Sequence, residues 1–353
     1  MPLKFRKQLI ADERYESAAF IDVTNNGVLD IVSGAWWYEG PDFTRRHKIG
    51  DVAYDGNYYD DFSTIALDIN GDGYLDFVTG GWSGAQLQWR ENPGDPEKEW
   101  PLHVIADCGN VETTRAWDVD GDGELEIVPN TPGKPLVVYK LARPGEFAAH
   151  QIYAAPQGHG LGFGDVSGSG RGDFVLHNGW LEAPEDRWSG EWIFHEDFDL
   201  GSASVPVLVV DVNGDGLNDL ICGQAHAYGL DWWEQGRDTA GNRTWTKHAI
   251  DPYNSQYHDL IWADIDGDGS PELITGKRYW AHCGNDPGER DDVGIYYFKW
   301  TGESFAKQVI DYGPTRVGKG TGIFFALADL RGTGRLDVLA PGKDGLYLFW
   351  NEG

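Results

Sequence analysis

The chain is poor in cysteine and methionine and has no long apolar run. Its cysteines, Cys108, Cys222 and Cys283, form no CxxC pair, so neither a disulfide framework nor a redox motif is predicted. No stretch has the length of a membrane span, and residues 1–10 lack the continuous apolar segment of an export signal. We therefore expect a cytoplasmic protein, with an export signal removed from a precursor as the alternative.

Basic residues are also scarce, with 28 lysines and arginines against 57 acidic residues and a formal net charge of -29. Proteins that bind the phosphate backbone of nucleic acids need the opposite sign, so this class of partner is excluded. Much of the acid recurs at fixed positions in a repeat, which favours bound divalent cations. Glycine (48), tryptophan (16) and tyrosine (16) are abundant, which is typical of short strands joined by tight turns.

One acidic phrase recurs seven times along the chain, at intervals of 46 to 65 residues. The copies begin at Asp22, Asp68, Asp118, Asp165, Asp211, Asp264 and Asp329. In each unit an apolar strand precedes the acidic loop and three further strands follow it. Repeats of this length, made of short strands, are the signature of propeller blades.

The two ends of the chain indicate how such a ring closes. Residues 5–10 match only the fourth strand of a blade, while the chain ends in a third strand at residues 346–350. The N-terminal strand should therefore complete the last blade and remove its open edges. The predicted fold is all-β, a single seven-bladed propeller over residues 1–353 with four-stranded antiparallel blades.

The acidic loops have the pattern D-x-D/N-G-D-G-x-x-D/E, whose side-chain oxygens at positions 1, 3, 5 and 9 can enclose Ca²⁺. The pattern is complete in four loops: Asp68, Asn70, Asp72 and Asp76; Asp118, Asp120, Asp122 and Glu126; Asp211, Asn213, Asp215 and Asp219; Asp264, Asp266, Asp268 and Glu272. It is degraded at Asp22, Asp165 and Asp329, and in the last copy Arg331 can place a cation at the metal position. We predict structural calcium in the complete loops. The alternative is aspartate–glycine turns closed by their own hydrogen bonds.

These loops and blade phrases resemble FG-GAP/VCBS repeats over essentially the whole chain. Residues 159–165 (HGLGFGD) and 179–182 (GWLE) also resemble the propeller domain of fungal aldos-2-ulose dehydratases. This resemblance implies an enzyme that eliminates water from keto-sugars such as 1,5-anhydrofructose. Propeller-type ulvan lyases share the architecture and the β-elimination chemistry.

The ten histidines fall into two groups. Five occupy the same fourth-strand position in successive blades, which indicates an architectural role: His47, His103, His150, His195 and His248. The other five do not repeat: His159, His177, His226, His258 and His282. They lie in or beside connections that, in an up-and-down blade, all reach the face opposite the acidic loops.

The same connections bring aromatic and charged side chains to this face, which we call the mouth. They are Arg14, Tyr15, Glu16, Tyr58, Tyr59, Asp60, Asp61, Glu112, Tyr257, Asp259, Lys277, Arg278, Tyr279, Trp280 and Lys319. Rings can stack on the faces of a sugar while polar groups bind its hydroxyls, so a carbohydrate is the expected ligand. We expect Tyr58, Tyr59, Arg14, Trp280 and Lys319 to bind it.

The leading hypothesis is a carbon–oxygen lyase of the dehydratase type that acts on a keto-sugar or a uronide-type substrate. His258 or Tyr257 would be the base, and Lys277 and Arg278 would neutralise the enolate. A divalent metal such as Zn²⁺, or the substrate carbonyl, would be bound by His159, His226 and His282. The alternative is a non-catalytic, calcium-stabilised propeller that binds a glycan or a protein, and a third reading is a scaffold whose mouth is blocked.

Overall fold

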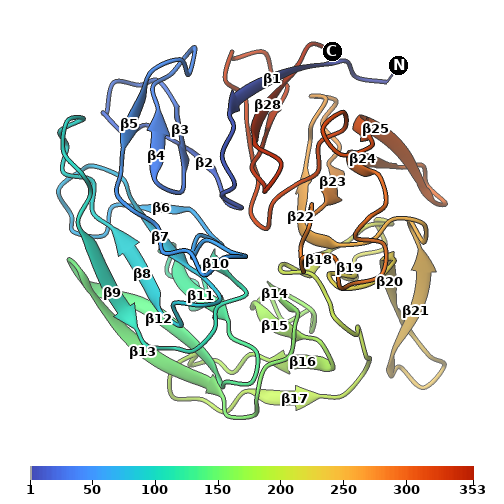
Figure 1. Ribbon diagram of the computed structural model, residues 1–353. Coiled ribbons are helices and arrows are strands. Elements are labelled where there is room, and N and C mark those ends of the chain that lie inside the picture. The colour runs from blue at the N-terminus through green and yellow to red at the C-terminus, as the bar shows by residue number, and fades with distance from the viewer. Residues whose placement is uncertain (1) are drawn as a thin grey trace.

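The computed structural model describes residues 2–353 and confirms the seven-bladed propeller, with seven sheets arranged in a ring (Figure 1). Each sheet has four antiparallel strands, and the described residues form no helix. Among these residues there is accordingly no helical segment that could cross a membrane.

The blades follow one another along the chain. The first blade consists of β2 (Ala19–Ile21), β3 (Asp30–Ser33), β4 (Trp36–Tyr38) and β5 (Arg46–Lys48), and the second of β6 (Ile65–Leu67), β7 (Asp76–Gly80), β8 (Leu87–Arg90) and β9 (Leu102–Ala106). The third blade consists of β10 (Thr113–Trp117), β11 (Glu126–Asn130), β12 (Leu136–Arg143) and β13 (Glu146–Tyr153), and the fourth of β14 (Leu161–Gly164), β15 (Asp173–Leu176), β16 (Gly179–Glu182) and β17 (Ile193–His195). The last three are β18 (Leu208–Val210), β19 (Asp219–Gly223), β20 (Leu230–Arg237) and β21 (Arg243–Ala249); β22 (Tyr257–Ala263), β23 (Glu272–Lys277), β24 (Val293–Trp300) and β25 (Phe305–Gly313); β26 (Ala326–Ala328), β27 (Asp337–Ala340), β28 (Leu346–Asn351) and β1 (Phe5–Ala11).

The ring closes as the sequence predicts, because β1 is the outer strand of the seventh blade. It pairs antiparallel with β28, from Phe5 opposite Asn351 to Leu9 opposite Tyr347. The blue first strand and the red last strand lie side by side in Figure 1. A side-chain hydrogen bond of 2.7 Å from Trp350 Nε1 to Gln8 Oε1 crosses the same pair.

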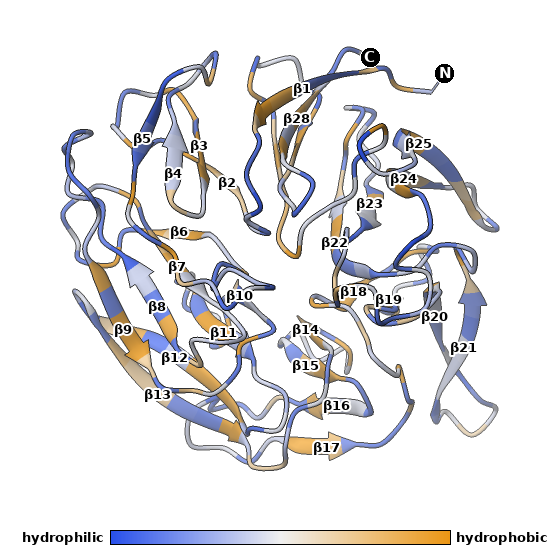
Figure 2. Cartoon of the chain, viewed as in Figure 1, coloured by the Kyte–Doolittle hydropathy of each residue, from blue (hydrophilic) through white to orange (hydrophobic). Residues whose placement is uncertain are grey.

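The core lies between adjacent blades. The second strands, such as β7, β11 and β19, are buried along their whole length, because the neighbouring blades cover both of their faces. The outer strands alternate between packed and exposed side chains, and Figure 2 shows both apolar and polar segments along β9 and β13. Apolar burial between blades therefore stabilises the ring as one unit.

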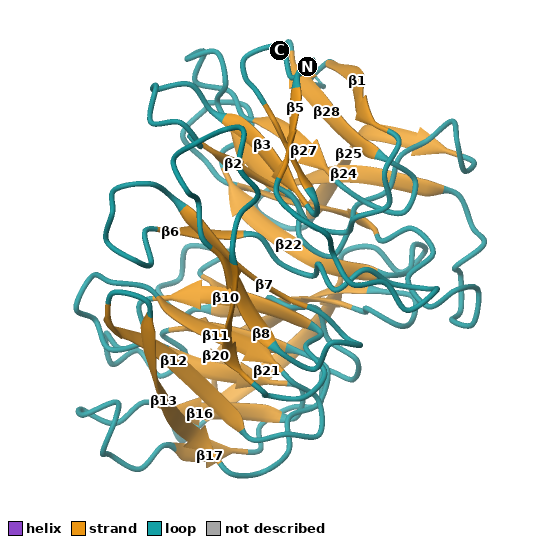
Figure 3. Cartoon of the chain, turned by 60° about the vertical axis from the view of Figure 1, so that its left-hand side comes forward, coloured by secondary structure: helices purple, strands orange, loops and turns teal. Residues whose placement is uncertain are grey.

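Four of the five repeating histidines stack on a tryptophan of the adjacent strand at 4.1–4.5 Å, while His150 packs against Trp188 of the next blade. The same four bind a glutamate through Nε2: His47 to Glu39, His103 to Glu91, His195 to Glu182 and His248 to Glu234. Loops emerge at both ends of the strand layers, as the turned view shows (Figure 3). The connections that carry the non-repeating histidines meet at one of these ends.

Deleting residues 2–11 should strongly lower the melting temperature. The deletion removes β1 and leaves β28 with an unpaired edge, so the ring loses both the pairing and the burial that close it. Thermal unfolding followed by circular dichroism measures the effect. Leu9→Ala is the matched control, because this side chain is 53% exposed and its loss should change the melting temperature little. Equal melting of the deletion variant and the wild type would contradict the closure argument.

Candidate functional site

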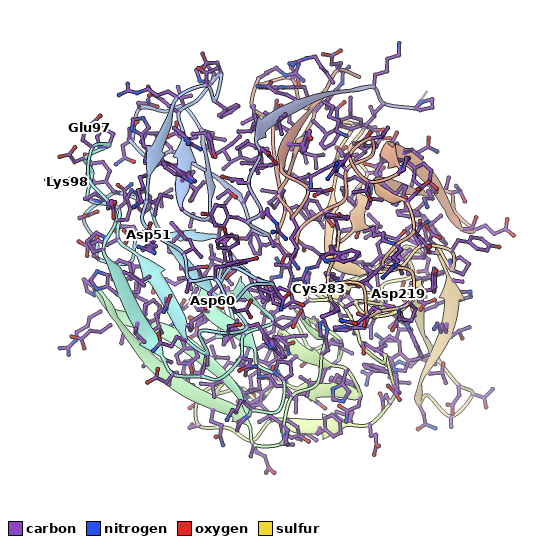
Figure 4. All side chains as sticks on the ribbon, viewed as in Figure 1. Asp51, Asp60, Glu97, Lys98, Asp219 and Cys283 are labelled. Carbon is purple, nitrogen blue, oxygen red and sulfur yellow. The ribbon has the colours of Figure 1, made fainter. Side chains whose placement is uncertain are left out.

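A cavity of about 310 Å³ opens at the centre of the mouth. Its lining residues come from connections of several blades: Tyr58, Phe62, Trp82, Glu112, Pro132, His159, His226, Arg278 and His282. In Figure 4, Cys283, the neighbour of His282, lies near the centre of the ring, whereas Glu97 and Lys98 lie at the rim. The cavity is enclosed by the connections between successive blades and by those between the second and third strands of a blade, which the repeat pattern assigns to this face.

Four of the five non-repeating histidines form one cluster. The ring of His226 lies 4.5 Å from His159, 4.1 Å from His282 and 5.7 Å from His258, measured between centroids. His258 lies 5.8 Å from His159 and 6.1 Å from His282. The structure thus brings these four residues together from blades four, five and six. His177 lies elsewhere, against Gly158.

Each ring of the cluster is held through Nδ1. His159 Nδ1 lies 2.6 Å from the Ala203 carbonyl oxygen, and His258 Nδ1 lies 3.2 Å from that of Gln256. These oxygens are acceptors only, so each Nδ1 carries the proton and donates it.

Asp286 holds the other two rings of the cluster. Its Oδ2 accepts from Nδ1 of both His226, at 3.0 Å, and His282, at 2.5 Å. With all four Nδ1 atoms bonded to oxygen, Nε2 of His226, His258 and His282 keeps a free lone pair, whereas Nε2 of His159 faces Glu112 Oε1 at 3.2 Å. This is the arrangement in which histidines bind metals or accept protons.

Burial keeps three of these imidazoles neutral. It lowers the pKa of His226 to about 4, with further contributions from His159 and His282. Burial, followed by the charge of Arg278, also lowers the pKa of His258 and of His282. One candidate ligand atom each from His159, His226 and His258 lie within 4.8 Å of one another. The donor set therefore fits a divalent ion that prefers imidazole, such as zinc.

Buried charges surround the cluster. Arg278, 1% exposed, lies 2.6 Å from Glu16 Oε2 through Nε and 3.6 Å from Glu112 Oε1 through Nη1. Lys343 Nζ lies 3.4 Å from the second oxygen of Glu16. Burial acts to raise the pKa of Glu112, but the facing His159 and Arg278 outweigh it and lower the pKa to about 2. The charge of Arg278 is therefore balanced by carboxylates of the protein itself.

Tyr257 and Lys277 do not reach the cavity, which corrects two predicted catalytic residues. They lie opposite each other in the β22–β23 pair, and Tyr257 packs in the core of its blade with its hydroxyl donating to Asp251 at 2.8 Å. Lys277 Nζ binds the Gly288 carbonyl. Neighbouring residues of a strand point to opposite sides. His258 and Arg278, the next residues along the chain, take the side that faces the mouth.

Four of the five predicted sugar-binding residues also lie outside the lining. Lys319 is buried against Asp344, and Arg14 is exposed to solvent. Tyr59 stacks on Tyr54 at 4.5 Å, while Trp280 lies beside Tyr279 with its ring centroid 6.3 Å away. Lys319, Tyr59 and Trp280 are thus occupied by their own neighbours.

Tyr58 is the predicted sugar-binding residue that lines the cavity, and its hydroxyl donates to the Ala281 carbonyl at 3.0 Å. Sequence reasoning missed Phe62, Trp82, Pro132, Lys343 and Asp286. For Asp286 a signal exists: it lies four residues after His282, in the connection that makes the sixth interval between repeats the longest.

In the four complete acidic loops the first aspartate closes the turn. Asp68, Asp118, Asp211 and Asp264 each accept hydrogen bonds of 2.7–3.0 Å from the backbone N–H groups three and five residues later. These bonds are the ones expected of aspartate–glycine turns. Calcium at these loops stays a prediction.

The ring, its acidic loops and its repeats define a seven-bladed β-propeller with FG-GAP-like repeats, and the FG-GAP-like repeat family matches residues 68–128 and 211–275. The chain is also similar to aldos-2-ulose dehydratase from Phanerodontia chrysosporium, with 22% identity over 264 residues. That match covers 61% of this chain and 27% of the dehydratase, so the chain corresponds to about a quarter of it.

A solved structure of an Agrocybe aegerita lectin, described as recognising non-reducing terminal N-acetylglucosamine, shares 17% identity with the chain. The superposition covers 96% of this chain and 85% of the lectin, with a TM-score of 0.49.

Replacing Arg278 by methionine should destabilise the fold by about 3–5 kcal/mol, because the substitution leaves Glu16 and Glu112 buried without their counter-charge. Urea unfolding at neutral pH measures the change in free energy. Arg14→Met removes an exposed arginine of the same face and should have little effect. Equal stability of the two variants would show that the buried pairs do not hold the mouth together.

Proposed function

We propose that the chain is a carbohydrate-active lyase that eliminates water from a keto-sugar bound in the mouth cavity. The observation that carries this proposal is the cluster of His159, His226, His258 and His282, with every Nδ1 bonded to oxygen and Nε2 of His226, His258 and His282 left free. The similarity to a protein named aldos-2-ulose dehydratase supports the reaction class.

The lining of the cavity suits a neutral sugar. Tyr58, Phe62, Trp82 and Pro132 offer flat apolar surfaces on which a pyranose ring can stack. A uronide would need a free cation for its carboxylate, and the charge of Arg278 is already balanced by Glu16 and Glu112. Between the two substrate classes that the sequence leaves open, these contacts favour the keto-sugar.

We assign the base to His282 in place of His258 or Tyr257, which removes His282 from the predicted metal ligands. His282 lines the cavity, its Nε2 is free, and Asp286 behind it stabilises the imidazolium that forms when the base takes a proton. The base removes the proton beside the substrate carbonyl, and the electron pair of that C–H bond becomes the enolate. The enolate then expels the β-hydroxyl, which leaves as water after it gains a proton and gives the unsaturated ketone.

Tyr58 is placed to supply that proton. A tyrosine hydroxyl carries its proton at neutral pH, and burial raises the pKa of Tyr58 further, so this group can donate a proton but cannot serve as the base. Its side chain lines the same cavity as His282.

His159, His226 and His258 would hold a divalent ion such as zinc. When bound, such an ion acts as a Lewis acid that polarises a carbonyl oxygen. This assignment moves His258 from base to ligand, because its side chain is 1% exposed and does not line the cavity. Glu112 Oε1 lies 3.2 Å from His159 Nε2, which places a carboxylate beside these ligands.

The test is turnover of 1,5-anhydrofructose and other 2- and 3-keto-sugars, followed by the absorbance of the enone product, with and without added zinc. His282→Gln should lower kcat at least about 100-fold, the usual loss when a general base is removed. His103→Gln is the matched control, since this histidine lies on the outer strand β9 and should leave kcat unchanged.

Two outcomes would contradict the proposal. Full activity of His282→Gln would remove the base assignment. Binding of a sugar or glycan by calorimetry, with no product from any keto-sugar, would instead show a non-catalytic carbohydrate-binding propeller.

A further inference from the structure

A lysine ammonium lies inside two of the four complete acidic loops. Lys140 Nζ is 2.9 Å from Asp120 Oδ2, 2.7 Å from Asp122 Oδ2 and 2.8 Å from Glu126 Oε1. In the sixth blade Lys299 Nζ repeats this arrangement, at 2.5, 2.9 and 3.0 Å from the corresponding oxygens of Asp266, Asp268 and Glu272. In each loop one nitrogen thus binds the side chains at positions 3, 5 and 9, which are the oxygens that calcium would use.

Both lysines come from the same position of the third strand. Lys140 lies two residues after Val138, which pairs with His150, and Lys299 lies two residues after Tyr297, which pairs with Gln308. In blades two and five this position holds a glutamate: Glu91, two residues after Trp89, and Glu234, two residues after Trp232. Those glutamates bind His103 and His248 at 2.7 and 2.8 Å. Lysine and glutamate therefore mark two kinds of blade.

The acidic loops of the blades with lysine also differ from those of the blades with glutamate. The lysine blades have aspartate at loop position 3 and glutamate at position 9, namely Asp120 with Glu126 and Asp266 with Glu272. The glutamate blades have asparagine and aspartate there, namely Asn70 with Asp76 and Asn213 with Asp219. The lysine loops thus carry one more carboxylate, which the ammonium compensates.

The longer side chain at position 9 allows the contact. Asp76 uses both of its oxygens on backbone N–H groups, those of Ile69 at 2.9 Å and Asn92 at 2.7 Å. Glu126 needs only Oε2 for the backbone, at 2.7 Å from Val119 N, and presents Oε1 to the lysine.

We propose that Lys140 and Lys299 take the place of calcium, so that loops 118–126 and 264–272 are closed without a metal. Each lysine makes three charge-assisted hydrogen bonds, and in the third blade Asp120 Oδ2 also accepts from Trp188 Nε1 at 2.9 Å. A calcium ion would have to displace these donors and would repel the ammonium left beside it. The residues of these two loops therefore do not fit calcium, which restricts the sequence prediction to loops 68–76 and 211–219.

The seventh blade uses a related device. Arg331, at position 3 of a degraded loop, has Nη2 3.1 Å from Asp337 Oδ1 at position 9. A protein cation thus faces the position-9 carboxylate in this loop as well, and the arginine comes from the loop itself rather than from the third strand.

Calcium titration of the whole chain by calorimetry, after chelation, tests the proposal. The double substitution Lys140→Met and Lys299→Met keeps the side-chain length but removes both charges. We expect the variant to bind two more calcium ions per chain than the wild type, to melt at a lower temperature in chelator, and to recover when calcium is added. Lys247→Met is the control, because this lysine pairs with Asp231 outside the acidic loops.

A second measurement does not depend on the lysine variants. Asp118→Asn with Asp264→Asn in the wild-type background should leave the number of bound calcium ions unchanged. A loss of calcium from this variant would show that the ion displaces the lysines and would overturn the proposal. An unchanged stoichiometry and unchanged melting in chelator for the lysine variant would overturn it as well.

Discussion

The interaction on which both ring and site depend is the buried contact of Arg278 with Glu16 and Glu112. The arginine follows β23 in the sixth blade, Glu16 precedes β2 in the first, and Glu112 precedes β10 in the third. One guanidinium thus joins three blades across the axis of the propeller. A second buried pair, Arg115 with Asp259 at 2.7 Å, joins the third and sixth blades directly. Buried charges are tolerated only when they are paired, so these residues fix the distance between opposite blades.

The same contact sets the chemistry of the mouth. Burial has the largest effect on the pKa values of His258 and His282, and the charge of Arg278 lowers both further. Neutral rings of His226, His258 and His282 with free Nε2 atoms are the result. Glu112 is held beside His159 by the same arginine, which places a carboxylate at the edge of the histidine cluster.

The fold could be predicted because the same sequence pattern recurs in every blade of a propeller. Seven copies of one phrase define the blades, and the unmatched strand at residues 5–10 defines the closure. The face of the site followed from connectivity alone. Within that face, prediction failed where neighbouring residues of a strand point to opposite sides. His258 and Arg278 face the mouth, while Tyr257 and Lys277 point away from it. The alternation of side chains along a strand could be expected, but the sequence did not show which residue of each neighbouring pair would face the mouth.

Residues without a repeat counterpart were also lost to sequence reasoning. Asp286 lies in a connection of one blade only, so its signals were the unusual length of that connection and its place four residues after His282. Lys140 and Lys299 recur, yet each lies on a strand remote in sequence from the carboxylates that it binds. Their role depends on the third strand passing beside its own loop, which is tertiary information.

Closure by β1 has a consequence for the order of assembly. Within residues 2–353, β1 is synthesised before the other strands of the ring but pairs with β28, which follows them all, so the ring cannot close during the synthesis of the earlier blades. Until β28 is made, β1 has no partner strand, and an unpaired strand is a template for aggregation. The charged side chains of Arg6 and Lys7 on this strand oppose such aggregation, and in the closed ring they bind Glu352 and Asp311. The strand that stays unpaired longest during synthesis of the ring thus carries charges that reduce its aggregation.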